Sequence, residues 1–371
     1  MGTLGRILLG LAMLGTLSAG AAAQSVADAA DALHIKFPDD RLQVNGLAWF
    51  TEDRSVLRRL PSRLKDTLRP PVWELAQQPS GGRIRFRTDS TRLAVVAHNP
   101  DTSTMHHMTS IGQSGIDLYV DGEYRNSAWP DAKAQIIREW ALGEEPRMRE
   151  VTLYLPLYKG LTVERLSLDP GATMGVPSSF ALSRPVVFYG SSITQGGCAE
   201  NPGLSYSAIV ARSINVDFVN LGFSGNGLGE PAVAQALAEI DASAFVLDYW
   251  ANPSPAVYRD TLPGVVDTLR ARHPQTPILL TGAYWFSGEA SSASLRAQQE
   301  EKRRIAREFV AARRTSGDRA LLFVDGLEML SREQAAGLVD GVHANALGFH
   351  YCARGLEPHL RRALNLPGAG R

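Results

Sequence analysis

The C-terminal half of the chain contains a serine, a histidine and an aspartate whose positions could support acyl-transfer chemistry. Ser192 stands in Gly190-Ser-Ser-Ile-Thr194, directly after an apolar run, and His343 follows Asp340 by three residues. A serine hydroxyl is a weak nucleophile unless a neighbouring base removes its proton, and a carboxylate commonly orients that base. The residue types therefore predict Ser192 as nucleophile, His343 as base and Asp340 as the group that fixes the imidazole tautomer.

These residues need a scaffold that brings distant segments together, and the second half of the sequence predicts one. Short apolar runs alternate with segments of helical character, a pattern typical of βα units around a parallel sheet that is covered on both faces. In such sheets functional groups gather where strands end and loops begin. The predicted strands are 185–189, 216–221, 244–248, 277–281 and 320–324, and the predicted helices include 231–240, 260–272 and 294–314.

The first part of the chain, from about residue 24 to 168, has a different pattern. Short β-rich runs are separated by turns, Asp121-Gly122 is typical of a hairpin, and long helical periodicity is missing. This pattern predicts a small all-β sandwich of jelly-roll type. The predicted strands are 82–87, 92–97, 116–120, 123–125, 150–158 and 161–168.

The second half of the sequence resembles the SGNH, or GDSL-type, hydrolase superfamily of esterases and acyl hydrolases. The family's first block, Gly-Asp-Ser-[Leu/Ile], corresponds to Gly190-Ser-Ser-Ile193, in which Ser191 replaces Asp as in a GxSI subgroup. The fifth block, Asp-x-x-His, corresponds to Asp340 and His343. The resemblance implies a three-layer, flavodoxin-like hydrolase domain with a parallel sheet and a Ser-His-Asp triad.

The resemblance also implies an oxyanion hole. The Gly of the family's second block corresponds to Gly225, and the Asn of its third block corresponds to Asn252, although the family's Gly-x-Asn-Asp is Trp250-Ala-Asn-Pro253 here. The backbone N–H groups of Ser192 and Gly225 and the Asn252 amide would stabilise the oxyanion, and losing one such donor costs about 3 kcal/mol. This chemistry requires no metal and no cofactor. Gly115-Ile-Asp-Leu-Tyr119 resembles the GxDLY signature of the β-rich N-terminal domain that accompanies this subgroup.

The first residues have the pattern of a cleavable secretory signal. Arg6 precedes an uncharged apolar stretch, 7–20, and Ala21-Ala-Ala23 offers a small-residue cleavage site. The stretch is short for a membrane span, and no cysteine lies nearby to carry a lipid. The sequence therefore predicts a periplasmic or secreted protein. The predicted divisions are a signal peptide 1–23, a β-sandwich 24–168, a linker 169–184 and a hydrolase domain 185–371.

Composition limits the partners of the protein. The 38 Lys and Arg residues are balanced by 38 Asp and Glu residues, so no excess of positive charge can neutralise phosphates. This argues against nucleic-acid binding, and no later segment is long and apolar enough to insert into a membrane. The only two cysteines, Cys198 and Cys352, could form a disulfide in an oxidising compartment or stay buried as free thiols. The oligomeric state stays open.

One glycine pattern and one histidine pattern could each indicate a different kind of binding site. Gly225-x-Gly-x-Gly229 followed by Asp248 is partly like a dinucleotide site, but the spacing is not G-x-G-x-x-G. The adjacent His106 and His107, with His98 nearby, could be metal ligands. Neighbouring residues of a strand point to opposite faces, which favours a structural or substrate-facing role for one of the pair, and His107 is the predicted substrate contact.

Four aromatic residues near predicted strand ends also allow two interpretations. They could belong to the buried core, or they could line a substrate cleft on the side of the sheet where Ser192 lies. We include them with His107 as predicted substrate-binding residues: Tyr249, Trp250, Tyr284 and Trp285.

The leading hypothesis is an exported serine esterase that removes a small acyl group, with acetyl favoured, from a carbohydrate or similar polar ester. The carbohydrate part depends on export, on the aromatic loops and on the β-sandwich, which is analogy at the level of the fold. A lipase, thioesterase, lactonase or O-acyltransferase would use the same residues. A carbohydrate-binding protein with an inactive hydrolase domain is the alternative from another class, and the presence of Ser192 and His343 argues against it.

Overall fold

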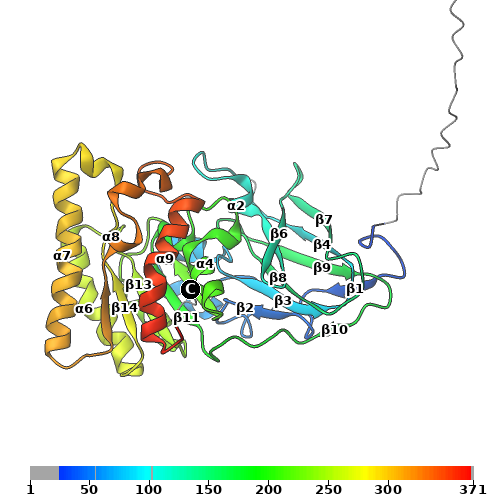
Figure 1. Ribbon diagram of the computed structural model, residues 1–371, viewed down its shortest axis with the longest axis horizontal. Coiled ribbons are helices and arrows are strands. Elements are labelled where there is room, and N and C mark those ends of the chain that lie inside the picture. The colour runs from blue at the N-terminus through cyan, green and yellow to red at the C-terminus, as the bar shows by residue number, and fades with distance from the viewer. Residues whose placement is uncertain (1–24, 55, 102, 369–371) are drawn as a thin grey trace, which may run out of the picture.

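The computed structural model describes residues 25–54, 56–101 and 103–368. Two parts of the chain lie side by side along the long axis, an antiparallel β-sandwich and a parallel sheet with its helices (Figure 1). The predicted signal peptide lies outside the described residues. Among the residues that the structure describes, no helix has the length and apolar character needed to cross a membrane.

The N-terminal part consists of two packed antiparallel sheets, as predicted. One sheet has the order β1-β9-β4-β7, and the other has the order β10-β3-β8-β5-β6 with β2 paired to β3. Apolar side chains of both sheets, such as Phe86, Leu93 and Leu153, form one shared core. The strands are β1 (Leu33–Lys36), β2 (Gln43–Asn45), β3 (Arg83–Thr88), β4 (Arg92–His98), β5 (Ile116–Val120), β6 (Glu123–Ala128), β7 (Gln135–Ala141), β8 (Arg149–Tyr154), β9 (Thr162–Leu168) and β10 (Met174–Gly175).

Short helical segments interrupt the sandwich, and the predicted linker 169–184 includes a strand. Met174 and Gly175 of this segment pair with Thr88 and Arg87 of β3. The linker segment therefore lies along the sandwich before it enters the parallel sheet. The helical segments of this part are η1 (Ser62–Thr67), α1 (Pro70–Ala76) and α2 (Ser110–Ser114).

The C-terminal part is built on a parallel sheet with the order β12-β11-β13-β14-β15. Numbered within the sheet this order is 2-1-3-4-5, the flavodoxin-like arrangement that the sequence predicts. Nearly all residues of its strands are buried, because helices cover both faces of the sheet. The strands are β11 (Val186–Gly190), β12 (Phe218–Gly222), β13 (Ala244–Asp248), β14 (Ile278–Thr281) and β15 (Leu321–Val324).

The helices of this part pack in two groups, α4 with α9 and α8, and α6 with α5 and α7. Figure 1 shows α6 and α7 at the end of the molecule that lies farthest from the sandwich. The predicted helices 231–240, 260–272 and 294–314 correspond to α5, α6 and α7. The elements are α3 (Ser192–Gln195), η2 (Pro202–Leu204), α4 (Tyr206–Ser213), α5 (Pro231–Glu239), α6 (Pro255–Arg272), η3 (Ser287–Ala290), α7 (Ala293–Thr315), α8 (Gly326–Met329), η4 (Arg332–Gly337) and α9 (Ala346–Ala363).

The strand order brings three loops to one edge of the parallel sheet. In the register of the sheet, Gly190 at the end of β11 lies beside Gly222 of β12 and Asp248 of β13. The loops that follow these strands therefore begin next to one another, at the point where the strand order reverses. This is the edge at which the sequence places its candidate catalytic residues.

Two polar residues of the N-terminal part, Arg59 and Asp117, connect it to the C-terminal part, and we call them with their partners the interdomain contact. Asp117, from the GxDLY-like sequence, accepts hydrogen bonds at Oδ2 from the side chain of Asn201, at 3.0 Å, and from the backbone N–H of Gly203, at 2.7 Å. Its Oδ1 accepts one from Ser127 at 2.6 Å. Three donors, one of them from the N-terminal part and two from the C-terminal part, therefore bind the buried carboxylate.

Arg59 makes the second half of the interdomain contact, and it is completely buried. Its guanidinium donates to the carbonyl oxygens of Leu75 and Gln78, at 2.7 and 2.8 Å, and to that of Gly222 at the end of β12. It also stacks over the ring of Phe223. Arg59 thus fixes the start of the loop that contains Gly225 by binding backbone oxygens.

Candidate active site

Ser192 lies at the tight turn between β11 and α3. The preceding residue, Ser191, caps α3 by accepting a hydrogen bond from the N–H of Ile193 at 3.2 Å. A Cβ at Gly190 would lie 2.7 Å from the carbonyl oxygen of Asp248, so the close approach of the strands requires glycine there. The turn leaves the Ser192 side chain at the sheet edge, with 8% of the residue exposed.

His343 and Asp340 occupy one loop ahead of α9, and this loop brings them to Ser192. The Oγ atom of Ser192 lies 2.9 Å from Nε2 of His343. On the other side of the ring, Nδ1 lies 2.8 Å from Oδ2 of Asp340. The carboxylate accepts from Nδ1–H, which leaves Nε2 free to accept the proton of the serine hydroxyl. The three predicted residues are therefore arranged as a continuous Ser–His–Asp chain.

Asp340 is held in its ionised form by hydrogen bonds. Partial burial acts to raise its pKa, but donation from the backbone N–H and ring of His343 and from the N–H of Val342 outweighs burial and lowers the pKa to about 2. The two backbone bonds measure 2.8 Å from His343 and 3.0 Å from Val342, both to Oδ1. The carboxylate is thus charged at any pH at which His343 could act as a base.

The loop that contains His343 is fixed from both sides. Tyr284 donates its hydroxyl proton to the carbonyl of Val342 at 2.6 Å, and the N–H of Cys198 donates to the carbonyl of Ala344 at 3.1 Å. Gly341 has φ of +87°, a conformation that favours glycine, and it allows the turn between Asp340 and His343. These contacts hold the imidazole in reach of Ser192.

The predicted oxyanion donors come from the loops after β11, β12 and β13. Asn252 accepts a hydrogen bond at Oδ1 from the N–H of Gly227 at 3.0 Å, so its amide NH2 points elsewhere. Within the described residues, this NH2 and the backbone N–H groups of Ser192 and Gly225 have no hydrogen-bond partner. Gly225 is exposed and has φ of +68°. With Ser192, Asp340 and His343, Gly225 and Asn252 form what we call the active-site edge.

Gln195 is a buried residue of the site that sequence reasoning missed. Its Oε1 accepts from the N–H of Ser224 at 3.0 Å, next to Gly225, and its Nε2 donates to the carbonyl of Leu157 at 3.0 Å. It therefore ties the Gly225 loop to α3 and to the N-terminal part. Its place three residues after Ser192, on the same helical turn, is the only sequence signal that could have found it.

Three of the predicted substrate-binding aromatics are core residues, and that prediction was wrong for them. Tyr249, Trp250 and Tyr284 are exposed by 0%, 1% and 2%. Trp250 donates from Nε1 to the buried carboxylate of Asp248 at 2.8 Å, and the ring of Tyr284 packs against that of Trp250. They continue the apolar strands into the interior instead of facing the cleft. Trp285 is half-buried, and its role as a substrate contact stays a prediction.

The buried carboxylate of Asp248 binds side chains of the segments that surround the site. Burial raises its pKa, although four side chains donate to it. A carboxylate so enclosed has a structural role. It therefore does not support the interpretation of Asp248 as part of a dinucleotide site. Its donors are Thr194 at 2.9 Å, Tyr206 at 2.8 Å, Trp250 at 2.8 Å and Thr281 at 2.5 Å.

His107 lies beside the candidate triad, although not in a strand as expected. Residues 106–107 form a turn before α2, so the argument from alternating strand faces does not apply. The exposed ring of His107 lies 5.4 Å from the ring of His343, measured between centroids. His98 contacts Glu164 at 3.6 Å instead of sharing this site. Both cysteines are buried and free, so the possible Cys198–Cys352 disulfide does not form.

A hollow of about 550 Å³ adjoins the site and is lined by both parts of the chain. Ser224 and Asn226, which flank Gly225, form one side. Tyr158, another lining residue, donates to the carbonyl of Ser192 at 3.3 Å. Most of the other lining side chains are polar, and they include Glu74, Gln78, Asp101, Ser103, Gln113 and Lys159.

Two family models match adjacent parts of the chain. Residues 183–361 match the GDSL-like lipase/acylhydrolase family, and residues 34–174 match the GxDLY N-terminus of SGNH hydrolase-type esterases. A search of curated proteins finds no match.

Solved structures of similar fold match most of the chain. A protein described as a GDSL-like lipase from Bacteroides ovatus is 29% identical, with a TM-score of 0.83 over 91% of this chain and 100% of that chain. A salicylyl acyltransferase from a tetracycline biosynthetic pathway is 22% identical, with a TM-score of 0.77 over 92% and 100%. An acetyl xylan esterase from the rumen bacterium Butyrivibrio proteoclasticus is 14% identical, with a TM-score of 0.59 over 90% and 99%.

The acyltransferase and the acetyl xylan esterase are similar to this chain in fold alone. The two family models, by contrast, match its amino-acid sequence. The hydrolase match includes the segments of Ser192, Asp340 and His343, and the N-terminal match includes Asp117. The chain therefore belongs to the GDSL-like, or SGNH, family of lipases and acylhydrolases, and it is a carboxylic ester hydrolase with a GxDLY-type N-terminal domain.

Proposed function

We propose that this protein is an exported serine esterase that removes small acyl groups, acetyl above all, from a carbohydrate or similar polar alcohol. The observation that carries the catalytic part is the Ser192–His343–Asp340 chain, with separations of 2.9 and 2.8 Å. Hydrogen-bond reach between nucleophile and base, with a third group orienting the base, is the arrangement that activates a serine. Export rests on the sequence pattern of residues 1–23.

The proposed reaction proceeds through an acyl-enzyme. His343 takes the hydroxyl proton as Ser192 Oγ attacks the ester carbonyl, and Asp340 stabilises the imidazolium that forms. The carbonyl oxygen becomes an oxyanion that accepts hydrogen bonds from the free donors of Ser192, Gly225 and Asn252. His343 then protonates the departing alcohol. A water molecule, activated by the same imidazole, attacks the acyl group and releases the free acid.

The hollow beside Gly225 supports a polar alcohol as the leaving group. Its lining includes the charged residues Asp101 and Lys159 and the amides of Gln78 and Gln113. Polar groups of this kind bind hydroxyl-rich molecules, whereas a lipase needs an apolar surface for its acyl chain. The acetyl xylan esterase named above has the same fold, which agrees with a carbohydrate ester but does not identify it.

Turnover of p-nitrophenyl acetate by wild type and Ser192→Ala tests the reaction. We expect kcat to fall by at least about 10⁴-fold in the variant, because no other group supplies the nucleophile. Ser191→Ala is the matched control: it removes the cap of α3, costs about 1 kcal/mol of stability and leaves turnover within tenfold of wild type. Equal turnover by wild type and Ser192→Ala would refute the assignment of the nucleophile.

The substrate class needs two further measurements. A series of p-nitrophenyl esters from acetyl to decanoyl should show rates that fall as the acyl chain lengthens. Rates that rise with chain length would indicate a lipase. Acetate release from a panel of acetylated sugars and polysaccharides then identifies the alcohol. Transfer of the acyl group to an added sugar, at the expense of free acetate, would instead indicate an acyltransferase.

A further inference from the structure

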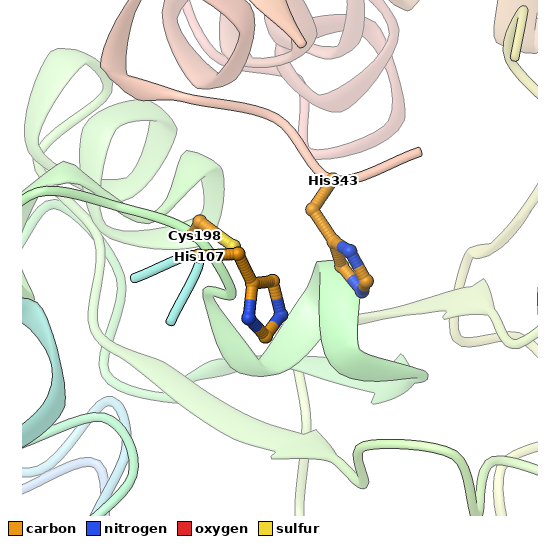
Figure 2. Close-up of side chains that lie close together, drawn as sticks. All are labelled: His107, Cys198 and His343. Carbon is orange, nitrogen blue, oxygen red and sulfur yellow. The ribbon is translucent and has the colours of Figure 1, made fainter. Parts of the chain in front are cut away.

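Three potential metal ligands from distant segments of the chain meet beside Ser192. His107, Cys198 and His343 each offer one ligand atom, and these atoms all lie within 4.8 Å of one another. Figure 2 shows the ring of His107 between the thiol of Cys198 and the ring of His343 in that view. The proposed reaction uses only one of the three, so the other two need a different explanation.

The neighbourhood of these residues is fixed by contacts of the adjoining backbone. Thr109, two residues after His107, donates its hydroxyl proton to the carbonyl of Glu200, two residues after Cys198. A Cβ at Gly112 would collide with the carbonyl oxygen of Ala199, so α2 packs directly on this segment. The Cys198 N–H in turn binds the carbonyl of Ala344, next to His343. The three ligands are thus held together by the fold.

Two imidazoles and one thiol form a ligand set that suits Zn²⁺. Zinc binds histidine nitrogen at about 2.0–2.1 Å and thiolate sulfur at about 2.3 Å, so its ligand atoms lie about 3.5 Å apart. The exposed ring of His107 can close the remaining gap by rotation. Three protein ligands leave a fourth position for water, and bound thiolate with the neighbouring Asp340 carboxylate would balance the charge of the ion.

Coordination must displace protons and hydrogen bonds that are present in the free site. The thiolate is the form of cysteine that binds a metal, so the Cys198 thiol releases its proton to solvent as the Zn–S bond forms. Both ring nitrogens of His343 already have partners, so the ion must replace either Ser192 at Nε2 or Asp340 at Nδ1.

We propose that Zn²⁺ binds reversibly to His107, Cys198 and His343 and thereby inhibits the hydrolase. Loss of either hydrogen bond of His343 disables the base, because it then cannot accept the Ser192 proton or is no longer oriented by Asp340. His107 belongs to the N-terminal domain, so the two domains together would make the metal site. The inhibitory effect rests on the proposed function, whereas the binding of the ion does not.

Cobalt binding tests the site without reference to activity. Co²⁺ substitutes for Zn²⁺, and a cobalt–thiolate bond gives a near-ultraviolet charge-transfer band. We expect this band in the wild-type protein, its loss on addition of Zn²⁺, and its absence in Cys198→Ser. Cys352→Ser, which changes the other buried thiol, is the matched control and should keep the band. A wild-type protein without the band, or a band that persists in Cys198→Ser, would overturn the proposal.

Inhibition is then measured with p-nitrophenyl acetate on protein that has been freed of metal with a chelator. We expect Zn²⁺ to lower turnover and the chelator to restore it. Cys198→Ser should raise the half-inhibitory zinc concentration by at least about tenfold, measured relative to the metal-free rate of the same variant. For His107→Ala the same shift is expected relative to its own metal-free rate, and His106→Ala should show none. Zinc activation, or equal inhibition of wild type and Cys198→Ser, would refute the proposal, whereas an inactive metal-free enzyme with a normal cobalt band would refute only the esterase function.

Discussion

The active-site edge and the interdomain contact both join segments that are far apart in the sequence, and both do so with polar side chains. They differ in how those polar groups are satisfied. At the active-site edge, the described residues leave the N–H groups of Ser192 and Gly225 and the Asn252 amide without partners. At the interdomain contact, Arg59 and Asp117 are buried and surrounded by hydrogen-bond partners.

This difference separates functional from structural polar residues more clearly than residue type does. A free donor at the end of a strand costs little in the resting protein because solvent can reach it, and it is available to a developing negative charge. A buried charge that lost its partners would cost several kcal/mol, so its partners must be complete. We therefore expect changes at the active-site edge to reduce kcat, and changes at the interdomain contact to reduce stability.

Apart from removal of the nucleophile, the largest effect is expected for Asp340→Asn. The amide keeps the size of the side chain but offers Nδ1 of His343 no acceptor of full charge and favours the wrong tautomer. The kcat should fall by about 10⁴-fold while the melting temperature changes little. Turnover and thermal unfolding measured on the same preparation provide the check, with Glu333→Gln in the neighbouring η4 as a control. A large loss of stability in Asp340→Asn would contradict the proposal that changes at the active-site edge reduce kcat and not stability.

Asn252→Asp tests a free donor at the same edge. The variant keeps the oxygen that binds the N–H of Gly227, so the loop is preserved, but it replaces the amide NH2 by a carboxylate oxygen that repels the oxyanion. We expect kcat to fall by about 10²–10³-fold with a small change in KM. If the Asp variant is as active as wild type, Asn252 is not an oxyanion donor, and the third family block has no catalytic counterpart at this position.

The sequence predicts the active-site edge better than the interdomain contact for a physical reason. Asp340 and His343 meet within one loop, so their spacing is visible in the chain, and Ser192 follows a recognisable apolar strand. Of the interdomain contact, Asp117 alone lies in a recognisable segment, the GxDLY-like sequence. Arg59 binds backbone carbonyl oxygens, which any residue provides. Such partners leave no pattern in the sequence.

The same limit explains the errors in the fold and in the substrate contacts. The parallel strands were predictable because each contains a short apolar run. By contrast, β7 has buried Ile136 next to exposed Ile137 and is defined by its pairing with β4. Tyr249 and Tyr284 are of a residue type that often lines a substrate cleft. The direction in which a side chain points at a strand end, however, depends on tertiary packing. The residues of the site could thus be named in advance, while most of what supports them could not.

Arg59→Met tests the interdomain contact directly. Removing the guanidinium leaves the buried carbonyl oxygens of Gln78 and Gly222 without their donor and takes one of two donors from that of Leu75, which should lower the free energy of unfolding by about 3 kcal/mol. The kcat of the folded fraction should change less than in Asn252→Asp. Urea unfolding monitored by Trp fluorescence gives the stability, and Arg59→Lys, which keeps the charge, should lie between. Normal stability with a kcat as low as that of Asn252→Asp would reverse the assignment.

The smallest effect concerns Asp117 and pH. Burial raises the pKa of its carboxyl to about 6, although Ser127, Gly203 and Asn201 donate to it. Between about pH 4, the ordinary pKa of an unfolded aspartate, and pH 6, the folded protein binds more protons than the unfolded chain, so this group makes stability fall as pH rises. The Asp117→Asn variant cannot titrate and should lose that slope while starting from a lower stability, because its NH2 replaces an acceptor. Urea unfolding of both proteins at several pH values in this window gives the difference. A difference that does not change with pH would mean that Asp117 stays ionised when buried, and that the interdomain contact, like Asp340 at the active-site edge, depends on a charged carboxylate.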